Sequence, residues 1–136
     1  DPRHGIAMRV FAKLVRMSGG DALHVGTFGV GKMRGDPEED LSNQGACVEE
    51  MGSLKPTLSV CSGGLHPGMV PELVRIAGKD IQVQAGGGVA GHPDGVRAGA
   101  MALSQAVDAA SLGVPLEEYA SDHPELGKAL QRWGRE

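Results

Sequence analysis

The chain has 136 residues, a formal net charge of −4 and 40% hydrophobic residues, which suits one domain or a piece of a larger one. Its basic residues are scattered and form no stripe, so nucleic acid is not expected as a partner. No apolar stretch approaches the roughly 20 residues of a membrane span, and no signal peptide opens the sequence. We therefore expect a cytoplasmic protein with no membrane partner.

Cys47 and Cys61 have no metal-ligand spacing and are expected to be reduced and buried. Asp1 leads almost directly into a helical pattern, which is typical of a fragment or a processed chain. The 22 glycines gather at the ends of apolar runs. This position indicates tight turns where the backbone approaches something closely.

The first elements follow from apolar spacing and helix-start signals. A helix is predicted from Ile6 to Met17, with Ile6, Val10, Leu14 and Met17 on one apolar stripe and Arg16 outside it. A short strand at 22–25 and a loop at 27–35 follow. Asp36 as N-cap and Pro37 at the first helical position predict a second helix that runs to Met51.

The remaining chain alternates strands and helices. A strand at 57–61 is continuously apolar and is expected to be buried on both faces, and a third strand is predicted at 81–85. A helix at 70–77 lies between them. A later helix is predicted from the stripe Val96, Ala100, Leu103, Val107 and Ala110, whose small residues suit close packing on a sheet. A last short helix is predicted near Asp122, with Glu125 completing a capping box.

Alternating strands and helices predict βαβ units and therefore an α/β fold with a parallel sheet. Three such units cannot close an eight-stranded barrel, which typically takes about 250 residues. The chain is then either a small open sheet or about three-eighths of a barrel.

All three strands end in polar or glycine-rich turns, at 24–27, 62–64 and 86–88. In parallel α/β structures these ends share one side of the sheet, where ligands bind. Glycine lets backbone N–H groups converge on an anion, and a following helix start adds its positive dipole end. Lys32, in a glycine-flanked loop, suits a mobile lid over a second charge. The pattern predicts a phosphate site.

Each signal alone has a plainer interpretation. The run 86–88 is also compatible with a simple tight turn, and His24 with a structural residue at a strand end. His66 and His92 precede prolines and are expected to shape turns. The acidic run of Asp36, Glu38, Glu39 and Asp40 is expected to be a solvated helix start. The prediction therefore depends on several sites meeting on one rim.

Four segments resemble one known family. The run 17–27 with Gly31-Lys32 looks like strand six and mobile loop six of the ribulose-bisphosphate carboxylase (RuBisCO) large subunit. The run Ser62-Gly63-Gly64-Leu65-His66-Pro67-Gly68 resembles strand seven in the archaeal form III wording, and 84–93 is similar to strand eight. The resemblance implies that residues 1–136 are the C-terminal part of a TIM (β/α)8 barrel, strands six to eight with a helical tail.

The resemblance also implies roles for single residues. Lys32 matches the catalytic lysine that closes over the site and stabilises the carboxylation transition state. His24 and Ser62 match residues that hold one phosphate of ribulose 1,5-bisphosphate. Gly64, Gly86 and Gly87 match glycines whose amides hold the other phosphate, and Gly63 is assigned to the same substrate-binding turn. Compared with the plant-type enzyme, the loop from His24 to Lys32 is one residue longer, and Arg34 stands where glutamate is familiar.

The family binds Mg²⁺ through a carbamylated lysine and two carboxylates that lie outside these residues, so no metal ligand is expected in this chain. The chain alone is expected to be inactive. With the missing part of the large subunit, as a homodimer or higher homo-oligomer, it would add CO₂, or O₂, to ribulose bisphosphate; CO₂ addition gives 3-phosphoglycerate. In form III enzymes this resembles nucleotide salvage.

Two alternatives stay open at this point. The first is a RuBisCO-like enolase or isomerase of sulphur salvage, which is disfavoured because His24, Lys32 and Ser62 are all present. The second is a non-catalytic, phosphate-binding half-barrel, or a fragment that needs its missing half to fold. Such a piece would expose sheet edges and apolar faces.

Overall fold

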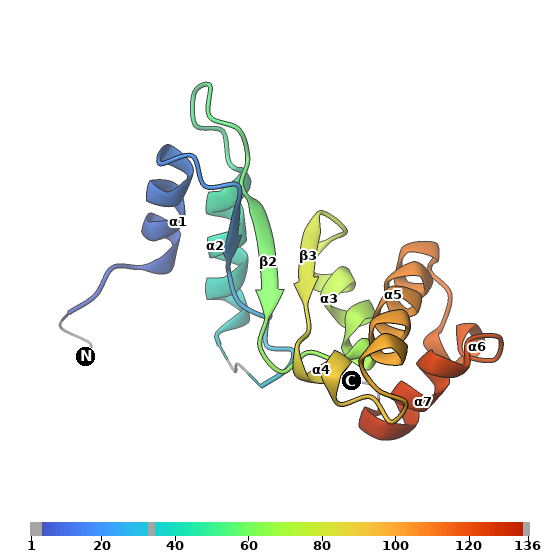
Figure 1. Ribbon diagram of the computed structural model, residues 1–136. Helices are drawn as coiled ribbons and strands as arrows, with labels where there is room; N and C mark the ends of the chain where they lie inside the picture. Colours follow the sequence, from blue (N-terminus) through green and yellow to red (C-terminus); the bar gives the residue numbers. More distant parts are fainter. Residues whose placement is uncertain (1–3, 33–34, 135–136) are drawn as a thin grey trace.

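The computed structural model describes residues 4–32 and 35–134, so Arg34 lies outside the described residues. Three parallel strands form a sheet in the order β1-β2-β3, made of β1 (Ala22–His24), β2 (Leu58–Ser62) and β3 (Ile81–Gln84). Figure 1 shows the helices arranged around this sheet, with α1 beyond β1 and the C-terminal helices beyond β3. The predicted α/β class and the parallel sheet are confirmed.

The helices around the strands begin largely where the sequence indicates. They are α1 (Met8–Met17) before β1, α2 (Pro37–Val48) between β1 and β2, α3 (Val70–Ala77) between β2 and β3, and α5 (Val96–Leu112) after β3. The Asp36 carboxylate accepts a hydrogen bond from the Glu38 N–H at 3.0 Å, which confirms the predicted N-cap. Short turns that the sequence analysis did not predict are the 3₁₀ helix η1 (Pro67–Met69), α4 (Gly87–Ala90) and α6 (Leu116–Tyr119).

The two faces of the sheet differ in what covers them. Leu23, Cys61, Ile81 and Val83 point to the face that packs with α2 and α3 in one apolar cluster. In the register of the ladder, His24 lies beside Val60 and Gln82, and Ser62 lies beside Gln84. These side chains belong to the opposite face, so most polar side chains of the strands lie away from α2 and α3; Ser59, beside Leu23 and Ile81, is the exception. β2 is buried at Ser59, Val60 and Cys61, whereas Leu58 is 41% exposed.

The helix α1 does not bury the apolar face that its sequence pattern predicts. Ala12 and Arg16 are its buried residues. The predicted stripe is exposed: Ile6 is 67% and Met17 63% accessible, and Val10 and Leu14 are also exposed. The described part of the chain therefore presents an uncovered apolar helix face, as expected for a piece of a larger unit.

Across that part no helix has the length and apolar character that crossing a membrane requires.

Two predictions about the C-terminal helices are wrong in detail. In α5 the buried residues are Gly99, Ala102, Ala106 and Ala109, whereas Val96 and Val107 are exposed. The small residues of α5 pack against α4, α7 (Pro124–Trp133) and α3 rather than onto the sheet. The N-cap of α7 is His123 and it makes no side-chain cap bond. Because Glu125 instead accepts a bond from Gln105 at 2.9 Å, there is no capping box at Asp122.

The close packing of α4 on α5 predicts a large effect at Gly99. A Cβ added there would lie 2.0 Å from the Val89 carbonyl oxygen, so Gly99→Ala must push the two helices apart. We expect a loss of about 1–3 kcal/mol in the free energy of unfolding. The matched control is Gly45→Ala in α2, where a Cβ meets nothing within 4 Å. It should stabilise the protein by roughly 0.5–1 kcal/mol. Urea unfolding of both variants checks the pair, and equal stabilities would contradict it.

Candidate functional site

The carboxyl ends of β1 and β2 bring two predicted residues into contact. His24 is the last residue of β1 and Ser62 the last of β2. The His24 Nδ1 and the Ser62 Oγ are 2.7 Å apart and exposed. Because the hydroxyl occupies Nδ1, the Nε2 of the ring is the nitrogen that points to other partners. The parallel register therefore places an imidazole and a hydroxyl together at the open rim of the sheet.

The loop after β1 lies across the turn after β2. The Lys32 N–H donates to the Gly63 carbonyl at 3.2 Å. Gly31 has a φ of +87°, and a Cβ there would meet the same carbonyl oxygen at 2.7 Å. A Cβ on Gly64, whose φ is +72°, would come within 2.6 Å of the Lys32 side chain. The lysine stem thus lies directly over the glycine turn, and glycine is required on both sides of the contact.

The turn after β3 packs against the turn after β2. Gly86 is the N-cap of the single-turn helix α4, and its carbonyl accepts from the N–H groups of Val89 and Ala90. Gly88 is buried, and a Cβ there would lie 2.2 Å from the Leu65 carbonyl oxygen. No atom lies within 4 Å of a Cβ built on Gly86 or Gly87. The helix start is therefore open to a ligand, while Gly88 allows the two turns to touch.

A pocket of about 530 Å³ lies where these three turns meet, and it is lined by Gly31, Lys32, Gly64, Leu65, His66, Met69, Gly87, Gly88 and Trp133. The first N–H groups of a helix have no partner within the helix, and Gly87 and Gly88 occupy such positions in α4. Among the described residues of the lining, Lys32 is the only one with a formally charged side chain. The arrangement suits an anion.

The predicted site residues divide into three groups. Lys32, Gly64 and Gly87 line the pocket. His24 and Ser62 form their pair at the neighbouring strand ends, outside the pocket lining. Gly63 and Gly86 support the turns through their carbonyl oxygens rather than by facing the pocket. The structure brings all seven to one rim of the sheet.

Two aromatic rings in the pocket lining, those of His66 and Trp133, were not among the predicted site residues. The ring of Trp133, from the end of α7, stacks on His66, with 5.9 Å between ring centroids and 13° between planes. A Cβ on Gly91 would lie 3.2 Å from the same indole. Trp133 therefore packs against the chain after both glycine turns. Its position in the stripe of the last helix gave no signal of this, although it is the single tryptophan of the sequence.

His92 shapes its turn, as predicted. Its Nδ1 accepts a hydrogen bond from the Asp94 N–H at 3.0 Å, so Nε2 carries the proton donated to the Glu125 carbonyl at 2.9 Å. This links the turn after α4 to α7.

The described lining of the pocket does not fit a metal ion. It contains no carboxylate, and the hard cation Mg²⁺ binds oxygen ligands, above all carboxylates. Among residues 4–32 and 35–134 no group of three or more histidine, cysteine, aspartate or glutamate side chains could hold a metal ion.

Burial, with a smaller contribution from the negative charge of Asp40, raises the pKa of the Cys61 thiol to about 11. Cys61 is therefore protonated at neutral pH and is no nucleophile.

Gly87 and Gly88 make a sharp test of the pocket. Gly88→Ala forces α4 away from the backbone of Leu65 and His66, so we expect both the stability and the affinity for inorganic phosphate to fall. Gly87→Ala adds a methyl group in open space. It should leave the melting temperature within a few degrees and weaken phosphate binding alone, by roughly 10-fold for one lost or blocked amide contact. Thermal unfolding and ³¹P NMR titration separate the two variants. Unchanged phosphate affinity in both would remove the pocket as an anion site.

The family model and the similar proteins all indicate one family. Residues 1–133 match the family model "Ribulose bisphosphate carboxylase large chain, catalytic domain". The chain belongs to this family. It is 54% identical over 134 residues to the ribulose bisphosphate carboxylase of Pyrococcus furiosus, covering 98% of the chain and 32% of that protein. The chain thus spans about a third of the length of the curated relatives it matches.

Solved structures of the RuBisCO family agree with the fold. The octameric ribulose-1,5-bisphosphate carboxylase/oxygenase of Pyrococcus horikoshii superposes with a TM-score of 0.94 at 52% identity, over 98% of this chain and 32% of that one. A rubisco-like protein from Alicyclobacillus acidocaldarius reaches a TM-score of 0.87 at 38% identity, over 98% and 33%. The chain is thus more similar to the archaeal carboxylase than to this rubisco-like protein.

Proposed function

We propose that residues 1–136 are the C-terminal part of the catalytic barrel of a ribulose-1,5-bisphosphate carboxylase/oxygenase, with β1, β2 and β3 as barrel strands six to eight. The uncovered polar face of the sheet and the exposed apolar stripe of α1 support this placement, because a closed barrel would cover both. The identity to archaeal carboxylases supports the carboxylase over the other family activities. The missing part of the large subunit and further copies of it are the proposed partners.

The observation that carries the proposal is the meeting of three strand-end turns around one pocket beneath Lys32. A sugar with a phosphate at each end needs two separated anion positions. The Gly64 and Gly87 turns supply one, through backbone N–H groups. The His24–Ser62 pair, on the neighbouring strand ends, supplies the other. One hydrogen of the neutral pair is used between Nδ1 and Oγ, so one donor faces the phosphate, either the ring N–H at Nε2 or the hydroxyl.

In this proposal Lys32 is the group that acts on the reaction itself. Its ammonium lies on a flexible stem over the Gly64 turn, so it can close on the bound sugar and oppose the negative charge that develops as CO₂ adds. Closure of its loop also excludes water from a reactive enediolate. Because the pocket residues do not fit Mg²⁺, the metal ligands of the active protein would have to come from the rest of the subunit, and the chain alone is proposed to be inactive.

The full-length polypeptide that carries this chain provides the test. After activation with Mg²⁺ and CO₂, it should incorporate ¹⁴CO₂ into acid-stable 3-phosphoglycerate when ribulose bisphosphate is added. Parallel incubation with the phosphorylated sulphur sugar of methionine salvage tests the enolase alternative by ultraviolet absorbance of the enol product. Enolisation without fixation would overturn the carboxylase proposal in favour of the rubisco-like one.

A further inference from the structure

The loop that carries Lys32 starts with an unusual turn. Phe28 has a φ of +55° and Gly29 a φ of +79°, and the Val30 N–H donates to the Thr27 carbonyl at 2.9 Å. Two successive positive φ angles closed by this bond form a primed β-turn. Glycine, asparagine and aspartate favour such positions, whereas a bulky residue with positive φ is a rare outlier. Something outside the turn must therefore hold Phe28 in this conformation.

The carboxylate of Asp40 provides that support. It accepts hydrogen bonds from the Thr27 N–H at 3.1 Å and from the Phe28 N–H at 2.8 Å, both at Oδ2. Asp40 lies in the first turn of α2 and is only 7% exposed, so it is not the solvated residue that the sequence indicated. Its position at a helix start suits its negative charge. A buried carboxylate that accepts two backbone N–H groups holds them more firmly than a neutral acceptor would.

Two glycines, Gly26 and Gly35, lie so close to this carboxylate that a side chain at either position would contact it. A Cβ on Gly26, whose φ is +128°, would lie 2.1 Å from the Asp40 side chain, and a Cβ on Gly35 would lie 3.5 Å from its Oδ1. The Asp40 carboxylate thus lies close to the chain before Lys32, at Gly26, and after it, at Gly35.

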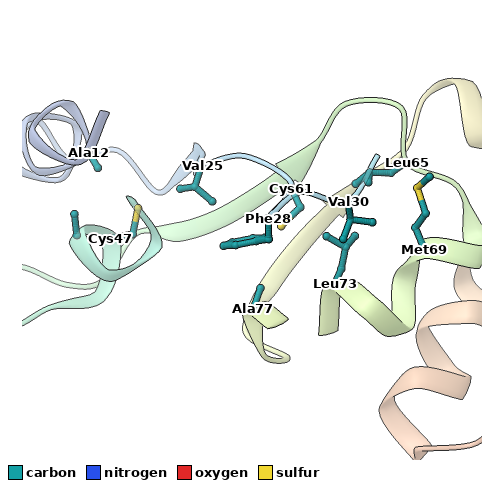
Figure 2. Close-up of a cluster of buried hydrophobic side chains, with 11 residues drawn as sticks. Ala12, Val25, Phe28, Val30, Cys47, Cys61, Leu65, Met69, Leu73 and Ala77 are labelled. Carbon is teal, nitrogen blue, oxygen red and sulfur yellow. The ribbon is translucent and has the colours of Figure 1, made fainter. Parts of the chain in front are cut away.

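From the turn to Lys32 the chain packs against the core and against the turn after β2. Figure 2 shows Phe28 and Val30 among the buried side chains, with Cys61, Leu65 and Leu73 in the same cluster. The next residue, Gly31, packs on the Gly63 carbonyl, and the Lys32 N–H donates to that carbonyl. The orientation of the turn therefore determines where the lysine enters the pocket.

We propose that Asp40 is a positioning residue for Lys32, which fixes the strained turn at Thr27 and Phe28 and so sets the position from which the lysine reaches the reacting sugar. This inference rests on the proposed carboxylase function. Asp40 acts through the loop and contacts no substrate.

The test compares Asp40→Ala and Asp40→Asn in the full-length polypeptide. Asp40→Ala removes the acceptor of both amides, and kcat for carboxylation should fall roughly 10-fold or more, because small misplacements of a reacting group are costly. The CO₂/O₂ partition should change, while the affinity for ribulose bisphosphate changes little, since the glycine turns are untouched. Asp40→Asn keeps one oxygen that can accept both N–H groups and should restore most of kcat.

The matched control is Asp36→Ala, which removes an exposed carboxylate at the start of the same helix. It should lower stability through the lost N-cap but leave kcat and the CO₂/O₂ partition unchanged. If Asp40→Ala lowers only the melting temperature, as Asp36→Ala does, the positioning role is wrong and Asp40 is merely structural.

Amide hydrogen exchange rates in the unmodified protein test the inference without any variant. The amides of Thr27 and Phe28 should exchange slowly, and rapid exchange of both would overturn the inference even if the Asp40 variants failed to fold. A parent protein that fixes no CO₂ would overturn the proposed function instead. Protected amides in that same inactive parent would still support the turn that Asp40 holds.

Discussion

Replacing Arg16 by alanine is expected to lower the free energy of unfolding by roughly 3 kcal/mol, because it removes the donor of several buried or partly buried backbone carbonyls at once. Arg16 is 3% exposed, and its guanidinium donates to four carbonyl oxygens. Two of them, those of Ala46 at 3.0 Å and Glu49 at 2.9 Å, belong to the C-terminal end of α2. The others, of Leu54 and Lys55, belong to the loop that leads into β2.

The role of Arg16 is thus to satisfy the last carbonyls of α2 and to join α1, α2 and the following loop. Arg16→Lys retains the charge but not the planar fork of donors, so it should recover only part of the lost stability. Arg9→Ala, on an exposed position of the same helix, should stay within about 0.5 kcal/mol of the parent. Chemical denaturation followed by circular dichroism measures all three. An Arg16→Ala variant as stable as Arg9→Ala would contradict this account.

Lys32→Gln in the full-length polypeptide is expected to reduce the rate of carboxylation by roughly 10²- to 10³-fold, the usual cost of removing one preorganised charge from a transition state. Glutamine keeps most of the stem that lies over Gly64 but has no positive charge. Binding of ribulose bisphosphate should weaken far less, because the backbone amides of the glycine turns remain. ¹⁴CO₂ incorporation and calorimetric titration separate the two effects.

The control for Lys32 is Lys79→Gln. Lys79 is exposed, precedes β3 at the opposite end of the strand and donates to the Ser111 carbonyl at 2.8 Å. It should change neither fixation nor binding. Equal rates in the Lys32 and Lys79 variants would remove Lys32 from the proposed chemistry.

The order of the elements could be predicted from the sequence because apolar periodicity and turn residues are local signals. The helix start at Asp36 and Pro37 and the buried middle of β2 are examples. The strand-end turns could also be predicted to meet, because parallel strands carry their carboxyl ends to one edge. The sequence therefore predicted which turns of the candidate site share a rim, including those of Lys32, Gly64 and Gly87.

Contacts that depend on tertiary packing could not be predicted in this way. The pattern of α1 predicts a buried apolar stripe, but in the described part of the chain the stripe is exposed and Arg16 is buried. Acidic residues in the first turn of α2 look alike in the sequence, and only the fold distinguishes exposed Asp36 from buried Asp40. Trp133 reaches the pocket from the far end of the chain, a long-range contact without a local signal.

The stacking of Trp133 on His66 gives the protein a built-in optical reporter. These 136 residues contain one tryptophan, so in this chain by itself emission excited at the red edge of indole absorption comes from this pocket wall. A phosphate bound as proposed beside Gly64 and Gly87 would change the electric field at the indole. Intrinsic fluorescence of this chain would therefore follow entry of the proposed ligand in real time, without labels or substitutions.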